Sequence, residues 1–166
     1  MMRLLVAQRS ECGGRERNED KIGFCANETL GCFVLADGAG GHGGGSIASE
    51  AVVQQVLTHF STDPKVDAEA INASILAARD ALSGTRKRHP EYPGMDTTIV
   101  TLMLDTERMQ GYWNYLGDSR LYLFRSGRAR ALTTDHSVLQ SMIDAGFFTG
   151  SLRGNTKRNM LYAAVG

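Results

Sequence analysis

An apolar strand that ends on a carboxylate and runs into glycines is the feature that most constrains this chain. Residues 32–36 are apolar or small, Asp37 follows them, and six of the eight residues after Asp37 are glycine. A helical pattern then begins at Ser46. Glycines let backbone carbonyls and a ligand approach closely, and a carboxylate is the oxygen ligand that a hard metal ion prefers. The run therefore predicts a metal site at the end of a buried strand.

The composition indicates one globular domain with no obvious polyanionic partner. The 166 residues are 42% hydrophobic and 22% charged, with 18 basic and 18 acidic side chains. A net charge of zero gives no electrostatic reason to expect binding to nucleic acid or to an anionic membrane. The cysteines (Cys12, Cys25 and Cys32) are odd in number and form no CxxC, which argues against a disulfide framework or a zinc knuckle. Because no stretch reaches transmembrane length and no signal-peptide pattern is found, we expect a cytoplasmic protein with reduced thiols.

The hydrophobic patterns predict strands, then two adjacent helices, then more strands. Strands are predicted at residues 4–8, 22–25, 31–36, 97–104, 111–116, 120–125 and 128–132. Helices are predicted from Ser46 to Phe60, between Asp67 and Pro90, and at residues 137–145. We expect Ser46 and Asp67 to be N-caps, and the basic run 86–89 to lie at a helix C-terminus, where cations suit the helix dipole. This order favours antiparallel sheets covered by helices over alternating βαβ units.

Three further acidic residues lie where they could join Asp37. Glu19 and Asp20 follow Arg15 in a polar loop, and Asp118 lies between two predicted strands. Taken alone, the first two are typical of a solvated loop, and Gly117-Asp118 suits a hairpin turn. If they meet Asp37, the carboxylates remain ionised together only around cations, and Arg15 becomes a bidentate ligand for a phosphate.

The glycine loop also matches two other motifs. Residues 38–43 satisfy GxGxxG between a strand and a helix, which is typical of a dinucleotide site. Asp37 would place negative charge beside the pyrophosphate, and the next element is a helix where a dinucleotide fold needs a second parallel strand. His42 and the glycines after it are similar to an esterase oxyanion loop, but the sequence contains no GxSxG.

Five motifs in order resemble the metal-dependent (type 2C) Ser/Thr protein phosphatases, in particular the short bacterial kind. They lie at residues 15–20, 34–42, 94–98, 117–122 and 132–137. The resemblance implies an α+β fold, an α-β-β-α sandwich in which two antiparallel sheets face each other with helices outside. It also implies hydrolysis of phosphoserine and phosphothreonine in proteins, in bacterial signalling that opposes a Ser/Thr kinase.

The resemblance assigns roles to the same side chains. It implies two Mn²⁺ or Mg²⁺ ions with a shared water, and a third, weaker ion. The implied metal ligands are Asp37, which bridges both ions, the Gly38 carbonyl, Asp20 and Glu19 directly or through water, and Asp118 for the third ion. Arg15 would bind the substrate phosphate. Residues 137–158 correspond to the flap beside the cleft.

Two departures from the family pattern affect these expectations. Ala39 stands where bacterial members commonly have Met and eukaryotic members His, so the general acid is unassigned. The family draws two more metal aspartates from motifs beyond Gly166, so residues 1–166 are expected to be a single domain lacking its C-terminal third. The alternatives are a catalytically incomplete fragment and a module that binds phosphoprotein without turnover.

Overall fold

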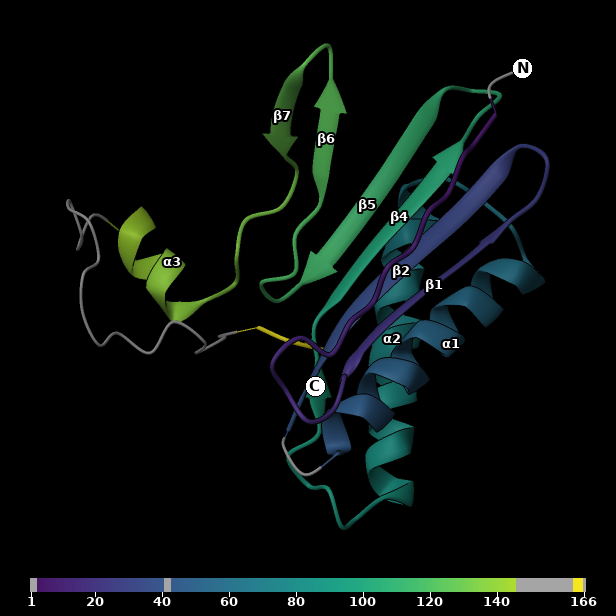
Figure 1. Ribbon diagram of the computed structural model, residues 1–166. Coiled ribbons are helices and arrows are strands. Elements are labelled where there is room, and N and C mark those ends of the chain that lie inside the picture. Colours follow the sequence, from purple (N-terminus) through teal and green to yellow (C-terminus); the bar gives the residue numbers. More distant parts are fainter. Residues whose placement is uncertain (1–2, 41–42, 146–162, 166) are drawn as a thin grey trace.

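Two helices cover one face of a five-stranded antiparallel sheet (Figure 1). The computed structural model describes residues 3–40, 43–145 and 163–165. The strands are β1 (Asp20–Ala26), β2 (Leu30–Ala39), β3 (Asp96–Thr97), β4 (Ile99–Asp105), β5 (Gln110–Leu116), β6 (Tyr122–Arg125) and β7 (Arg128–Ala131). The helices are α1 (Gly44–Thr62), α2 (Ala68–Arg88) and α3 (Val138–Asp144). The predicted α+β class is confirmed.

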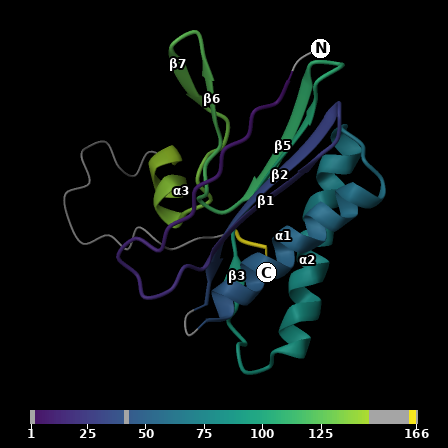
Figure 2. The same ribbon diagram turned by 45° about the vertical axis from the view of Figure 1, so that its right-hand side comes forward.

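The strand order places β2 at the centre of the sheet. The order is β1-β2-β4-β5, and the short β3 also pairs with β2. The hairpin β6–β7 forms a separate two-stranded sheet, which Figure 2 shows on the side away from α1 and α2. Trp113 on β5 contacts the segment that leaves this hairpin, because its indole N–H donates to the Leu132 carbonyl at 3.0 Å. The two sheets therefore adjoin one another.

Alternation along β2 decides which side chains face the helices. Cys32, Val34 and Ala36 are at most 2% exposed and belong to the core. The helices contribute the apolar stripes that their spacing predicts: Ala48, Val52, Val56 and Phe60 from α1, and Ile71, Ala78 and Leu82 from α2. Because strand side chains alternate, Asp37 lies on the opposite face of β2 from Ala36.

The helix ends confirm one predicted cap and correct the other. Asp67 caps α2, since its carboxylate accepts the N–H of Ala70 at 2.8 Å. The basic residues Arg86–Arg88 lie in its last turn, as predicted. The predicted cap at Ser46 is wrong: α1 begins at Gly44, after Gly43, whose φ is 97°. Glycines have low helix propensity, which favours the later start, but tight backbone packing against β2 overrides it here.

Two predicted strands differ from the structure. Residues 4–8 form no strand in the described part of the chain, although Val6 and Gln8 line a hollow against the sheet with Phe33. An apolar pattern alone does not make a strand, because a strand also needs a backbone partner. The predicted strand at 97–104 is broken at Thr98 into β3 and β4. The break frees Thr98 to bind the backbone of Asp37.

Candidate metal and phosphate site

Asp37 and Asp20 come together at the end of the central strand pair. They are directly opposite one another in the β1–β2 register, on the face away from the helices. Their carboxyl groups are in hydrogen-bonding contact. Two carboxyl groups can make such a contact only when they share a proton, and a cation can take the place of that proton. The structure thus joins two residues that sequence analysis could name only separately.

The charge environment raises the pKa of Asp37 from its ordinary value of 3.8 to about 6. Burial is the largest cause, followed by the charge and the hydrogen bond of Asp20. Asp118 also raises this pKa, whereas the Arg15 guanidinium lowers it. In the sequence, Arg15 is 22 residues before Asp37 and Asp118 is 81 residues after it. Both side chains nevertheless act electrostatically on Asp37.

Two threonines fix the backbone of Asp37. The Asp37 N–H donates to Thr98 Oγ1 at 3.0 Å, and the Thr98 N–H donates back to the Asp37 carbonyl at 2.9 Å. The Thr97 hydroxyl donates to the same carbonyl at 3.0 Å. Sequence reasoning placed these threonines in a motif but assigned them no role. Their role is to hold the end of β2, so that the carboxylate projects from a fixed backbone.

Arg86 on α2 supports the same segment from the helix side. Its guanidinium donates twice to the Met95 carbonyl, through Nε at 3.0 Å and Nη2 at 2.7 Å. Met95 is fully buried, two residues before Thr97. The basic run 86–89 gave no signal for this contact, because the run is also explained by the helix dipole.

Gly38 is required by its packing. Its N–H donates to the Glu19 carbonyl at 3.1 Å, and that carbonyl also accepts the Ser49 hydroxyl at 2.6 Å. A Cβ on Gly38 would lie 2.7 Å from the Glu19 oxygen and closer still to the Gly45 carbonyl. Gly45 in turn has no room for a side chain against Gly38. The glycines thus let the end of β2 pack directly on the first turn of α1.

Glu19 is the predicted ligand whose side chain lies against the first turn of α1. Its carboxyl carbon lies at the N-terminus of α1, 3.0 Å from where a Cβ on Gly45 would be. Glu19 and Asp20 are consecutive, and successive side chains of an extended chain point to opposite sides. Glu19 therefore faces the helix, where its negative charge suits the helix dipole.

These donors fit a hard divalent cation only in part. All are oxygen ligands, and the Asp20–Asp37 contact is one that a cation stabilises. Within residues 3–40, 43–145 and 163–165, however, no group of three or more His, Cys, Asp or Glu is placed to hold a metal ion. The described residues thus provide a carboxylate pair that needs further ligands, such as water. His42 and residues 146–158 of the predicted flap lie outside the described residues.

The raised pKa of Asp37 predicts how stability and cation binding depend on pH. Between about pH 4 and about pH 6 the folded protein keeps a proton that the unfolded chain has released, so this group lowers stability as the pH rises. A divalent cation should replace that proton. We therefore expect Mn²⁺ to raise the Tm more at about pH 7.5 than at about pH 5. Thermal unfolding with and without Mn²⁺ measures this, and equal shifts at both pH values would contradict it.

Comparisons with known proteins identify the family of this chain. Residues 7–156 match the family model described as protein phosphatase 2C. The chain belongs to the protein phosphatase 2C family. The resemblance inferred from the five motifs is thereby confirmed.

Among its relatives, this family member is 34% identical over 149 residues to the serine/threonine protein phosphatase PstP of Mycobacterium tuberculosis. That alignment covers 88% of this chain and 28% of PstP. It is 28% identical over 160 residues to the protein phosphatase PhpP of Streptococcus pneumoniae, covering 92% of this chain and 63% of PhpP. The chain therefore spans less than two thirds of either relative.

Solved structures of the family have the same fold. The catalytic domain of PstP in complex with two manganese ions superposes with a TM-score of 0.76 at 30% identity. The superposition covers 95% of this phosphatase 2C chain and 64% of that domain. In the part of the chain that the structure describes, no helix has both the length and the apolar character needed to cross a bilayer.

Proposed function

We propose that this chain carries the metal-binding and phosphate-binding part of a protein-serine/threonine phosphatase. The observation that carries the proposal is the Asp20–Asp37 contact, with a raised pKa at Asp37 and an arginine beside the pair. The carboxylate pair would bind divalent cations, and the neighbouring Arg15 guanidinium would bind phosphate. Hydrolysis of a phosphate ester uses both kinds of group. The two manganese ions of the related PstP domain support the same assignment.

The acidic residues of the site would each contribute to metal binding. Asp37 and Asp20 would hold the ions from the carboxylate side, with the Gly38 carbonyl as an additional oxygen ligand and Asp118 for a third, weaker ion. Glu19 would act through water from its place at the start of α1. Bound Mn²⁺ or Mg²⁺ would lower the pKa of a coordinated water and neutralise charge on the phosphoryl group.

Arg15 would bind two phosphate oxygens through its planar guanidinium and so orient the ester. Its side chain is exposed, which leaves it accessible to a phosphorylated residue on another protein. Ala39, at the exposed end of β2, has no proton to give to the leaving group. The proposed partners are cytoplasmic phosphoproteins modified by a Ser/Thr kinase, and residues 137–158 would form a flap beside them.

The test is hydrolysis of p-nitrophenyl phosphate and of a phosphothreonine peptide, each measured with Mn²⁺, with Mg²⁺ and with excess EDTA. Turnover that requires a divalent ion supports the proposal. Binding of the phosphopeptide without turnover would replace it with the binding-module alternative, which the incomplete ligand set among the described residues favours. Heat released on titration with NAD(P), but none with Mn²⁺, would favour a dinucleotide site instead.

A further inference from the structure

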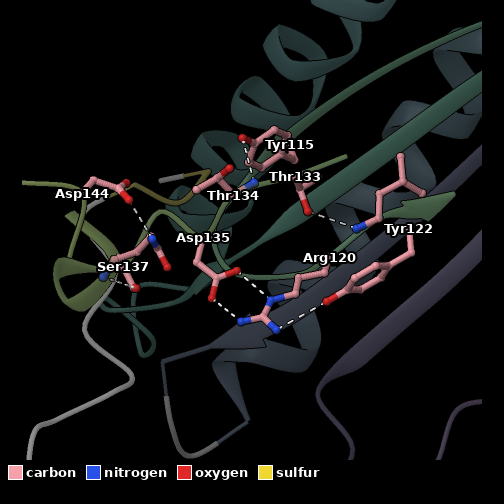
Figure 3. A network of polar contacts seen from close by, with 10 residues as sticks. Tyr115, Arg120, Tyr122, Thr133, Thr134, Asp135, Ser137 and Asp144 are labelled. Atoms are coloured by element: carbon pink, nitrogen blue, oxygen red, sulfur yellow. Dashed lines mark hydrogen bonds and ion pairs between the residues drawn. The ribbon is translucent and has the colours of Figure 1, made fainter. Parts of the chain in front are cut away.

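The loop that carries Asp118 is joined to the segment that leads into α3. Figure 3 shows the side chains of Arg120 and Asp135 pointing toward one another across these two segments. The first segment is 117–121, after β5, and the second is 132–137, before α3. The metal and phosphate site described above uses only Asp118 from either of them. The contacts between the segments therefore need an explanation of their own.

The strongest contact is a bidentate ion pair. Arg120 donates through Nε to one carboxylate oxygen of Asp135 at 2.8 Å and through Nη2 to the other at 2.6 Å. The Asp135 side chain is only 18% exposed, and the guanidinium holds the pKa of its carboxyl below the usual value. A paired fork of this kind is directional as well as attractive, so it fixes the relative position of the two segments.

Further polar contacts on both sides of the ion pair join segments 117–121 and 132–137; we call this set of contacts the junction. The His136 N–H donates to the Gly117 carbonyl at 2.9 Å, and the Gly117 N–H donates to His136 Nδ1 at 3.3 Å. The Leu121 N–H donates to the Thr133 hydroxyl at 3.1 Å. Tyr115 stacks on the ring of His136, with centroids 4.8 Å apart. Asp118 is thus flanked by contacts to the second segment.

The junction extends to the start of α3 on one side and to the backbone of Asp37 on the other. On one side, Ser137, the last residue of the second segment, caps α3 by accepting the Gln140 N–H at 3.1 Å. On the other side, the Ser119 hydroxyl hydrogen-bonds Thr98 Oγ1 at 2.7 Å, and Thr98 binds the backbone of Asp37. An unbroken series of contacts therefore connects Asp37, the Asp118 loop and the start of α3.

We propose that the Arg120–Asp135 pair is a positioning pair that sets Asp118 relative to Asp37 and couples this spacing to α3. The proposal rests on the proposed function, because it treats Asp118 as a cation ligand. Groups that orient a ligand without touching the ion change metal affinity by roughly 10- to 100-fold when they are lost. Arg120 and Asp135 act in this way, through the backbone of residues 117–121.

The test is a double-mutant cycle with Arg120→Gln, which removes the guanidinium, and Asp135→Asn, which is nearly isosteric. Mn²⁺ affinity is measured by calorimetry without substrate, and kcat, KM and Tm are measured in parallel. We expect each single variant to weaken the weakest Mn²⁺ site by about 10-fold. The double variant should be no weaker than either single one, because both changes break the same contact. Arg120→Lys should weaken Mn²⁺ binding almost as much as Arg120→Gln does, since the lysine ammonium cannot form the bidentate pair with Asp135.

Asp63→Asn is the matched control, because it removes an exposed ion pair with Lys65 that is remote from Asp118 in the sequence. It should leave the Mn²⁺ titration unchanged. A lower Tm with unchanged Mn²⁺ affinity in the Arg120 and Asp135 variants would overturn the proposal and leave a purely structural ion pair. Strictly additive effects would overturn it as well.

The two measurements separate this proposal from the proposed function. If the unmodified chain binds Mn²⁺ and the variants weaken binding, but no ester is hydrolysed, the positioning role stands and the phosphatase activity of this chain does not. If the unmodified chain hydrolyses esters and the variants retain its Mn²⁺ affinity and KM, the phosphatase stands and the positioning pair does not.

Discussion

Asp37→Asn is expected to abolish Mn²⁺-dependent hydrolysis and, at the same time, to make the metal-free protein more stable at neutral pH. If Asp37 holds the ions as proposed, loss of its carboxylate should remove several kcal/mol of charge stabilisation, which corresponds to a rate at least about 10³-fold lower. An amide cannot replace the carboxylate as a shared anionic ligand. Loss of activity and gain of stability have the same cause. The negative charge of Asp37 would bind cations, and in their absence it repels the Asp20 carboxylate.

The gain in stability follows from the pKa of Asp37. Above about pH 6 this carboxylate is ionised next to Asp20, although burial and its neighbours oppose the charge. An asparagine removes the charge and can donate an N–H to the Asp20 carboxylate. Because part of the side chain is exposed, solvent screens the repulsion, and we expect the Tm to rise by only a few degrees.

The measurements are phosphatase rates with Mn²⁺ and thermal unfolding in EDTA at about pH 7.5. Asp63→Asn is again the control, since it removes an exposed acid on the helix side of the molecule and should change neither quantity. A variant that keeps its activity would show that Asp37 is not a metal ligand. A variant with a lower Tm in EDTA would show that the Asp20–Asp37 contact stabilises the fold.

The sequence was sufficient to predict that Asp37 lies near the end of a buried strand and precedes a glycine loop, because an apolar run, a carboxylate and glycines each restrict the local backbone. The residue that lies opposite Asp37 on the neighbouring strand was harder to predict. The partner of Asp37 is set by the β1–β2 register, which depends on the turn at Asn27, whose side chain accepts the N–H groups of Thr29 and Leu30. Alternation along an extended chain would have separated Glu19 from Asp20, had the strand predicted at residues 22–25 been extended back to Asp20, where β1 begins.

The contacts that hold Asp37 and the start of α1 in place could not be predicted from local sequence patterns. Thr98 looked like an ordinary strand residue, yet it interrupts the strand and binds Asp37, 61 residues away. The start of α1 was misplaced for a related reason. Helix propensity favours a start at Ser46, whereas the packing of Gly45 on Gly38 is a tertiary contact that no single-segment pattern contains.

That packing leads to the second large effect: Gly38→Ala should destabilise the protein by about 4 kcal/mol or more. The new Cβ would lie 2.7 Å from the Glu19 carbonyl oxygen, a separation below 3.0 Å that real Cβ atoms essentially never show. The clashing atoms belong to the backbone and cannot rotate away. Relief requires β2 to move away from both the Gly45 carbonyl of α1 and the Glu19 carbonyl, and the second movement weakens the Gly38 N–H bond to Glu19.

Urea unfolding followed by the fluorescence of Trp113, the single tryptophan, measures this loss. Gly94→Ala is the matched control, because a Cβ there meets no atom within 4 Å and its φ is not left-handed. It should leave stability unchanged or slightly raised, since alanine restricts the unfolded chain. Domains of this size have only about 5–15 kcal/mol of stability, so the Gly38 variant should be partly unfolded at 37 °C or lose most of its margin. Equal urea midpoints for the Gly38 and Gly94 variants would mean that β2 and α1 can separate at little cost, and the carboxylate of Asp37 would then lack the rigid support on which its proposed role depends.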